Sequence, residues 1–134
     1  MLLAIEISNT NVVFGLYDGA TLSHTFRART VRASTADEYG VLLRQMLALR
    51  EIEPHRVQAV ILASVVPPLT DVMVDAVRHA CAREPLIVGP GMRTGISVHY
   101  ENPKDVGADR IPNSVAGFER AKGGGIVVDF GTAE

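Results

Sequence analysis

The stretch Leu2-Leu3-Ala4-Ile5-Glu6-Ile7-Ser8-Asn9-Thr10-Asn11 begins as an apolar strand and ends in a run of small polar residues. The apolar side chains predict a buried β-strand, and Ser, Asn and Thr favour a tight turn directly after it. Glu6 stands near the carboxyl end of this strand. Burying a carboxylate is costly unless a cation, hydrogen bonds or solvent compensates the charge. The stretch therefore predicts a strand that leads into a polar site.

A similar pattern closes the chain, in Ile126-Val127-Val128-Asp129-Phe130-Gly131-Thr132-Ala133. An apolar strand, expected over residues 126–130, again carries an acid and runs into small and hydroxyl residues. Carboxylates are ligands for hard cations, and small turn residues let backbone amides approach phosphate oxygens. The two stretches together predict a site for phosphate groups and a metal ion.

The composition is that of one globular domain. The chain has 134 residues, 47% of them hydrophobic, which suffices for a single core. Its 13 basic and 15 acidic residues give a net charge of -2, so no electrostatic argument favours nucleic acid or an anionic membrane as a partner. We expect neither a signal peptide nor a segment of the roughly 20 apolar residues that span a bilayer.

Cysteine and histidine usage predicts no disulfide framework and no zinc site. Cys81 is the only cysteine, which favours a cytoplasmic setting. His79 is two residues from Cys81 on an expected helix, so the two side chains do not face each other. We expect Cys81 to pack in the core.

Hydrophobic periodicity and turn residues predict eight elements and a terminal strand. Asp18-Gly19 predicts a hairpin turn, the Thr35 and Glu38 spacing predicts a helix capping box, and Pro67-Pro68 is expected to end the fourth strand. The expected strands are Leu2–Ile7, Val12–Tyr17, Ala20–Arg27, Val57–Val66, Leu86–Val88 and Ile126–Phe130, and the expected helices run from Thr35 to Leu49, from about Thr70 to Ala82 and from about Ala108 to Ala121.

This order predicts an α/β fold with a mixed sheet. Its order βββαβαβα matches a ribonuclease-H-like lobe over residues 1–121. The extra C-terminal strand, within residues 122–134, is surplus to this lobe.

A second polar stretch, Gly107-Ala108-Asp109-Arg110, places an acid beside an arginine where a helix is expected to begin. An acid at this position can be a simple helix cap, favoured by the helix dipole, or a catalytic group. Arg110 can pair with Asp109 structurally or bind a ligand. The pattern alone leaves these alternatives open.

Seven segments in the same order resemble the type III pantothenate kinase family, of the acetate and sugar kinase and actin superfamily. They are Leu2 to Asn11, Thr35-Ala36-Asp37-Glu38-Tyr39, Ser64-Val65-Val66-Pro67-Pro68-Leu69, Val88-Gly89-Pro90-Gly91, Tyr100-Glu101-Asn102-Pro103, Gly107-Ala108-Asp109-Arg110 and Asp129-Phe130-Gly131-Thr132-Ala133. The resemblance implies ATP-dependent phosphorylation of pantothenate in coenzyme A synthesis. It also implies a homodimer that uses Mg²⁺ and a monovalent cation, K⁺ or NH₄⁺.

The resemblance also implies roles for individual residues. Asp109 would be the catalytic base, Asp129 would support the monovalent cation, and Glu6 would face the divalent cation. Pantothenate would be held by Tyr100, Gly107, Ala108, Asp109 and Arg110. ATP and its phosphates would be bound by Glu6, Ile7, Ser8, Asn9, Thr10, Asn11, Val12, Val13 and Thr132.

The chain departs from the family pattern at several positions. Glu6 replaces an aspartate and Ser8 a glycine in the first phosphate loop, Glu134 replaces a threonine, and Pro112 replaces an aliphatic residue. The longer Glu6 side chain would displace a carboxylate that faces Mg²⁺, which tolerates little error in geometry. Ser8 adds a Cβ where a phosphate approaches or where φ is positive.

The resemblance implies two lobes of the kind found in actin-like ATPases, of which residues 1–121 are the first and residues 122–134 are the opening strand and phosphate motif of the second. We therefore expect little or no kinase activity from these 134 residues alone. Two other functions stay open: a lobe that folds and self-associates without catalysis, through an unpaired terminal strand, or a module that binds nucleotide or pantothenate without transfer.

Overall fold

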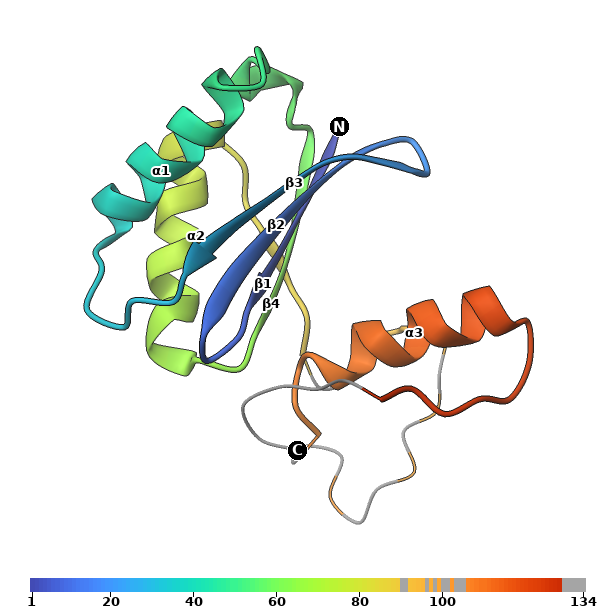
Figure 1. The fold of residues 1–134 in the computed structure, drawn as a ribbon. Coiled ribbons are helices and arrows are strands. Elements are labelled where there is room, and N and C mark those ends of the chain that lie inside the picture. The colour runs from blue at the N-terminus through green and yellow to red at the C-terminus, as the bar shows by residue number, and fades with distance from the viewer. Residues whose placement is uncertain (90–91, 96, 98, 100–101, 103–105, 129–134) are drawn as a thin grey trace.

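A five-stranded mixed sheet forms the centre of the computed structural model, which describes residues 1–89, 92–95, 97, 99, 102 and 106–128 (Figure 1). β1 (Leu2–Ile7), β2 (Asn11–Asp18) and β3 (Thr21–Arg29) form an antiparallel meander. β4 (Ala59–Ser64) pairs in parallel with β1, and β5 (Leu86–Ile87) pairs in parallel with β4. The strand order in space is β3-β2-β1-β4-β5.

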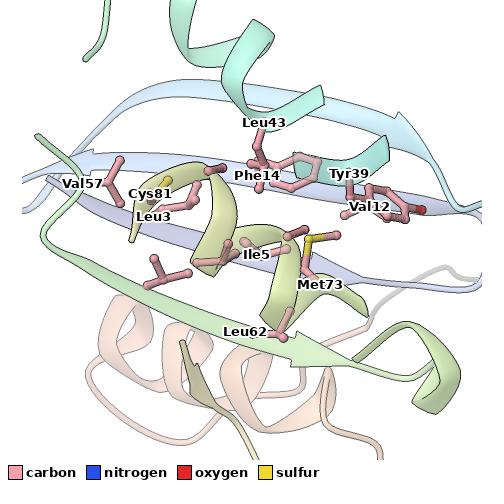
Figure 2. Close-up of a cluster of buried hydrophobic side chains, with 14 of the residues drawn as sticks. Leu3, Ile5, Val12, Phe14, Tyr39, Leu43, Val57, Leu62, Met73 and Cys81 are labelled. Carbon is pink, nitrogen blue, oxygen red and sulfur yellow. The ribbon is translucent and has the colours of Figure 1, made fainter. Parts of the chain in front are cut away.

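One face of the sheet carries the hydrophobic core. Alternate side chains of β1 and β2 are buried on this face, among them Leu3, Ile5 and Phe14. The period-two burial follows from the pleat, which turns successive side chains to opposite faces. Figure 2 shows these side chains meeting Leu43 from the first helix and Met73 from the second.

Two helices cover this face. α1 (Ala36–Ala48) begins with the predicted capping box: the Thr35 hydroxyl accepts from the Glu38 amide at 3.3 Å, and the Glu38 carboxylate accepts from the Thr35 amide at 2.7 Å. α2 (Pro67–Cys81) packs along α1, where Gly40 lies close to the backbone of Ala76. A 3₁₀ turn, η1 (Pro54–Arg56), precedes β4.

Cys81, at the end of α2, is buried as expected. Burial raises the pKa of its thiol, which keeps the sulfur protonated and unreactive at neutral pH. Near the same end of α2, the exposed Arg78 guanidinium contacts the Glu84 carboxylate at 2.7 Å and holds its pKa below the usual value.

The second helix begins earlier than predicted. Pro67-Pro68 was expected to end the preceding strand, with a helix from about Thr70, but α2 starts at Pro67. Proline fits the first turn of a helix, since its fixed φ is helical and its missing N–H would have no partner there. β4 is correspondingly shorter than the predicted strand over residues 57–66.

α3 (Arg110–Ala121) lies on the opposite side of the sheet from α1 and α2 (Figures 1 and 2). It starts two residues after the predicted position, and none of its 12 residues is buried. The chain then turns back along α3, so that Val127 meets the helix at Gly117.

The predicted terminal strand over 126–130 is wrong for the residues that the structure describes. Ile126, Val127 and Val128 have no strand conformation, and Ile126 is 92% exposed. A strand requires hydrogen bonds from a neighbouring strand, and this segment follows a helix instead. Residues 129 and 130 lie outside the described part of the chain.

The α/β prediction is confirmed. The described residues form a mixed five-stranded sheet and three α-helices.

Candidate functional site

The turn between β1 and β2 is tight and well defined. The Ser8 amide donates to the Asn11 carbonyl at 2.9 Å, which places Asn9 and Thr10 at the exposed tip. Ser8 is not among the described residues with positive φ. The serine therefore introduces no backbone strain at a position where the family pattern has glycine.

Glu6 lies on the sheet face opposite α1 and α2. It is half-buried, next to Val13 on β2 and Ala63 on β4. The Ser8 hydroxyl donates to its carboxylate at 3.4 Å. Partial exposure and this contact reduce the cost of a charge in the strand.

The segment that follows β3 braces the turn. The Thr30 hydroxyl donates to the Ser8 carbonyl at 2.6 Å, and the Thr30 amide donates to the Thr10 carbonyl at 2.9 Å. The Arg32 guanidinium donates to the Asn9 side-chain oxygen at 3.0 Å. Thr30 and Arg32 are not evident from the sequence, because they lie 22 and 23 residues from their partners in the turn and belong to none of the quoted motifs.

The other residues of the turn that were predicted to bind ATP phosphates differ in their solvent exposure. Ile7 and Val12 are fully buried in the core, so only their backbone groups can contact a ligand. Asn9 and Thr10 are exposed, whereas Asn11 and Val13 are half-buried. The side chains suited to phosphate are therefore those at the tip of the turn.

The second polar stretch forms the start of α3. Asp109 is the N-cap residue, and its carboxylate accepts from the Arg110 amide at 3.0 Å. This contact is with the backbone of Arg110, whose side chain is exposed. The cap interpretation is thus confirmed, and it leaves the half-buried carboxylate with further oxygen lone pairs for a ligand.

Gly107 makes room for this carboxylate. A Cβ on Gly107 would stand 2.5 Å from the Asp109 side-chain oxygen and 4.0 Å from the Val65 side chain. A contact of 2.5 Å is too short for carbon and oxygen, so a larger residue would force Asp109 to move. The position of Asp109 depends on the absence of a side chain at residue 107.

Val65 adjoins both polar stretches at one edge of the sheet. The Val65 amide donates to the Ile7 carbonyl at 3.0 Å, directly before the turn at Ser8, and Gly107 lies beside Val65. β1 and β4 are parallel, so their carboxyl ends share this edge. Ligands of open α/β sheets bind at such edges.

Three predicted site residues, Tyr100, Asp129 and Thr132, lie outside the described residues. Ala108 is half-buried between Gly107 and Asp109. Among the described residues there is no group of three or more acidic, histidine or cysteine side chains that could hold a metal ion. Glu6 is a single carboxylate of the kind that binds Mg²⁺ together with substrate phosphates, with a side chain one methylene longer than the aspartate of the family pattern.

The two residues considered for a zinc site differ in burial. The exposed His79 has its Nδ1 atom 3.7 Å from the Asp37 carboxylate on α1, whereas Cys81 is buried.

None of the helices in the described residues is both long enough and apolar enough to cross a bilayer.

Comparison with known proteins identifies the family. The model of the type III pantothenate kinase family matches residues 2–134. The chain belongs to this family. Relatives named type III pantothenate kinase include those of Anaeromyxobacter sp. strain K, 52% identical, and of Geobacter sulfurreducens and Moorella thermoacetica, both 47% identical. Each alignment covers 133 residues, or 99% of this chain and 52% of the relative.

The chain thus spans about half the length of the curated relatives that it matches. The family match includes the turn at Ser8 and the stretch from Gly107 to Arg110, which the fold brings to one edge of the sheet. Membership in the type III pantothenate kinase family confirms the resemblance seen in the sequence.

Proposed function

We propose that this chain forms the first half of a type III pantothenate kinase, which transfers a phosphoryl group from ATP to pantothenate and yields 4'-phosphopantothenate. In this proposal residues 1–121 form a ribonuclease-H-like lobe of the actin-like ATPase kind, and residues 122–134 open a second lobe. The observation that carries the proposal is that the Ser8 turn and the Asp109 segment both adjoin Val65 at one edge of the sheet.

The turn supplies the phosphate site. Asn9, Thr10 and Asn11 would offer amide and hydroxyl donors to the phosphate oxygens of ATP, with Thr132 as a further contact. Glu6 would hold Mg²⁺ together with those oxygens. When bound, the ion would neutralise charge that develops on the phosphates.

Asp109 supplies the base. The pantothenate hydroxyl oxygen forms a bond to the γ-phosphorus, and the bond from that phosphorus to the bridging oxygen breaks. The electron pair leaves with ADP, and the hydroxyl proton passes to the Asp109 carboxylate. A half-buried carboxylate held by the Arg110 amide suits this role, because the hydrogen bond fixes its position.

The Gly107 to Arg110 segment would also bind pantothenate, together with Tyr100. Pantothenate carries a carboxylate, and the exposed Arg110 guanidinium is a suitable partner for it. Asp129 would support K⁺ or NH₄⁺. The kinase would act as a homodimer in the cytoplasm.

We expect the 134 residues by themselves to show little or no turnover. A bound nucleotide in this family would lie between two lobes, and the chain matches only about half of each relative's length. Half of a cleft orients and encloses the reactants poorly.

An ATP-consumption assay with pantothenate, Mg²⁺ and K⁺ tests the proposal. The samples are the chain alone, the Anaeromyxobacter sp. strain K relative, and a chimera in which this chain replaces the matched half of that relative. We expect turnover from the relative and the chimera. Asp109→Asn in the chimera should lower kcat by about 100-fold or more, since it removes a general base.

Asp71→Asn is the matched control, because Asp71 is an exposed carboxylate on α2. It should leave kcat unchanged. A folded chimera without turnover, or one that Asp109→Asn leaves fully active, would contradict the proposed function.

The exposed apolar side chains favour a second candidate, an isolated lobe that self-associates without catalysis. Ile126, Val127, Val128 and Phe118 on and beside α3 are exposed. Apolar surface of this kind is a common site of association. Light scattering that showed a monomer at every accessible concentration would contradict this candidate.

A further inference from the structure

Three consecutive residues after β3 connect the phosphate turn to the core. Thr30 bonds to the backbone of the turn at Ser8 and at Thr10. The Val31 amide donates to the Tyr39 hydroxyl at 3.3 Å, and Tyr39 is only 3% exposed. The backbone of this segment is therefore fixed from both sides.

Arg32 extends from this fixed segment to the tip of the turn. Its guanidinium donates at 3.0 Å to the Asn9 side-chain oxygen, although both residues are exposed. A hydrogen bond of an exposed arginine stabilises the fold only a little, because water competes for it. The contact matters instead for the orientation of the Asn9 amide.

An asparagine amide has two unlike ends. The oxygen only accepts hydrogen bonds, and the NH₂ group only donates them. A phosphate oxygen is an acceptor, so it is attracted by the NH₂ group and repelled by the oxygen. Since arginine can only donate, Arg32 holds the oxygen of Asn9 and leaves the NH₂ group for an incoming acceptor.

We propose that Arg32 is a positioning residue, which sets the orientation of the Asn9 amide so that its NH₂ group binds a phosphate oxygen of the nucleotide. The inference rests on the proposed phosphate role of the turn. It assigns Arg32 an action through Asn9 and not a direct contact with phosphate.

The first test needs no ligand. Nuclear magnetic resonance of the 134-residue chain measures the order of the Asn9 side-chain NH₂ group. We expect Arg32→Met to lower this order and Arg32→Lys to restore part of it, because lysine can still donate to the Asn9 oxygen. Arg56→Met is the matched control for loss of one positive charge, since Arg56 is exposed beside η1. Unchanged order in Arg32→Met would overturn the proposal.

The second test is a titration with inorganic pyrophosphate, followed at the amides of residues 8–11. Loss of one oriented hydrogen bond should weaken binding by about three- to tenfold in Arg32→Met. Asn9→Ala should weaken it to a similar extent. In the double variant Arg32→Met/Asn9→Ala, the loss of Arg32 should add little, because its action has no Asn9 to act through.

Two other outcomes would contradict the proposal or its premise. If Arg32→Met weakens binding equally in the Asn9→Ala background, Arg32 acts directly on the phosphate and the proposal is wrong. If the parent chain shows no response to pyrophosphate, the proposed phosphate role of the turn fails, while the order of the Asn9 amide still decides whether Arg32 orients it.

Discussion

The residues of the site depend on neighbours that carry no charge. Asp109 has its position because Gly107 has no side chain, and Gly107 in turn lies against Val65 at the end of β4. The sequence shows an acid and a glycine two residues apart, which alone is a common helix-start pattern. The structure shows that the carboxylate occupies the space that a side chain at residue 107 would fill.

Gly107→Ala should therefore displace the Asp109 carboxylate. The Arg110 amide donates at 3.0 Å both to the Asp109 carboxylate and to the Gly107 carbonyl. It should lose the first of these hydrogen bonds and keep the second, so we expect its proton resonance to shift upfield. The free energy of unfolding should change by only about 0.5 kcal/mol, because the Asp109 side chain can rotate away from the added methyl group. In the chimera described above, kcat should fall.

Gly124→Ala is the control for this substitution, since nothing lies within 4 Å of a Cβ at Gly124. It should leave the Arg110 amide unchanged. An Arg110 amide that is equally unaffected by Gly107→Ala would contradict the steric argument.

Among the elements, α1 shows what neighbouring residues alone can predict. Its capping box was predicted from the spacing of Thr35 and Glu38, and both hydrogen bonds are present. The interaction spans four residues, so no distant segment is needed to form it. The start of α2 was predicted less well, because proline both ends strands and opens helices.

Thr35→Ala should lower the free energy of unfolding by about 1 kcal/mol, the usual loss for an N-cap side chain. Urea denaturation followed by circular dichroism measures the change. Ser34→Ala, one residue earlier and outside the capping box, is the control and should cost less than about 0.5 kcal/mol. Equal losses in the two variants would show that the box does not stabilise α1.

Across the whole molecule, burial is uneven. Phe14, in the layer between the sheet and the two helices α1 and α2, is fully buried, whereas Phe118 on α3 is 55% exposed. The hydrophobic free energy that stabilises the fold thus comes from one side of the sheet. α3 contributes little to it, although it carries Asp109 at its start.

Phe14→Ala should lower the free energy of unfolding by about 3–5 kcal/mol, since it removes a buried ring and leaves a cavity. Phe118→Ala should change it by only about 0.5 kcal/mol. Urea denaturation of both variants makes the comparison. A Phe118→Ala loss as large as that of Phe14→Ala would mean that α3 is packed in the folded chain.

Local patterns in the chain were enough to predict the three strands of the meander, the Asp18-Gly19 hairpin, the start of α1, the buried Cys81 and the family. Each rests on neighbouring residues or on motifs in register. Local patterns could not predict which segments far apart in the sequence pair with each other. Ile126 to Val128 have strand composition, yet they follow α3, because a strand exists only where another strand supplies hydrogen bonds. The contact from Arg32 to Asn9, and that from Gly107 to Val65, likewise join segments far apart in sequence. Only the folded chain brings them together, because the sheet aligns the ends of β1 and β4 and so defines the edge where the site forms.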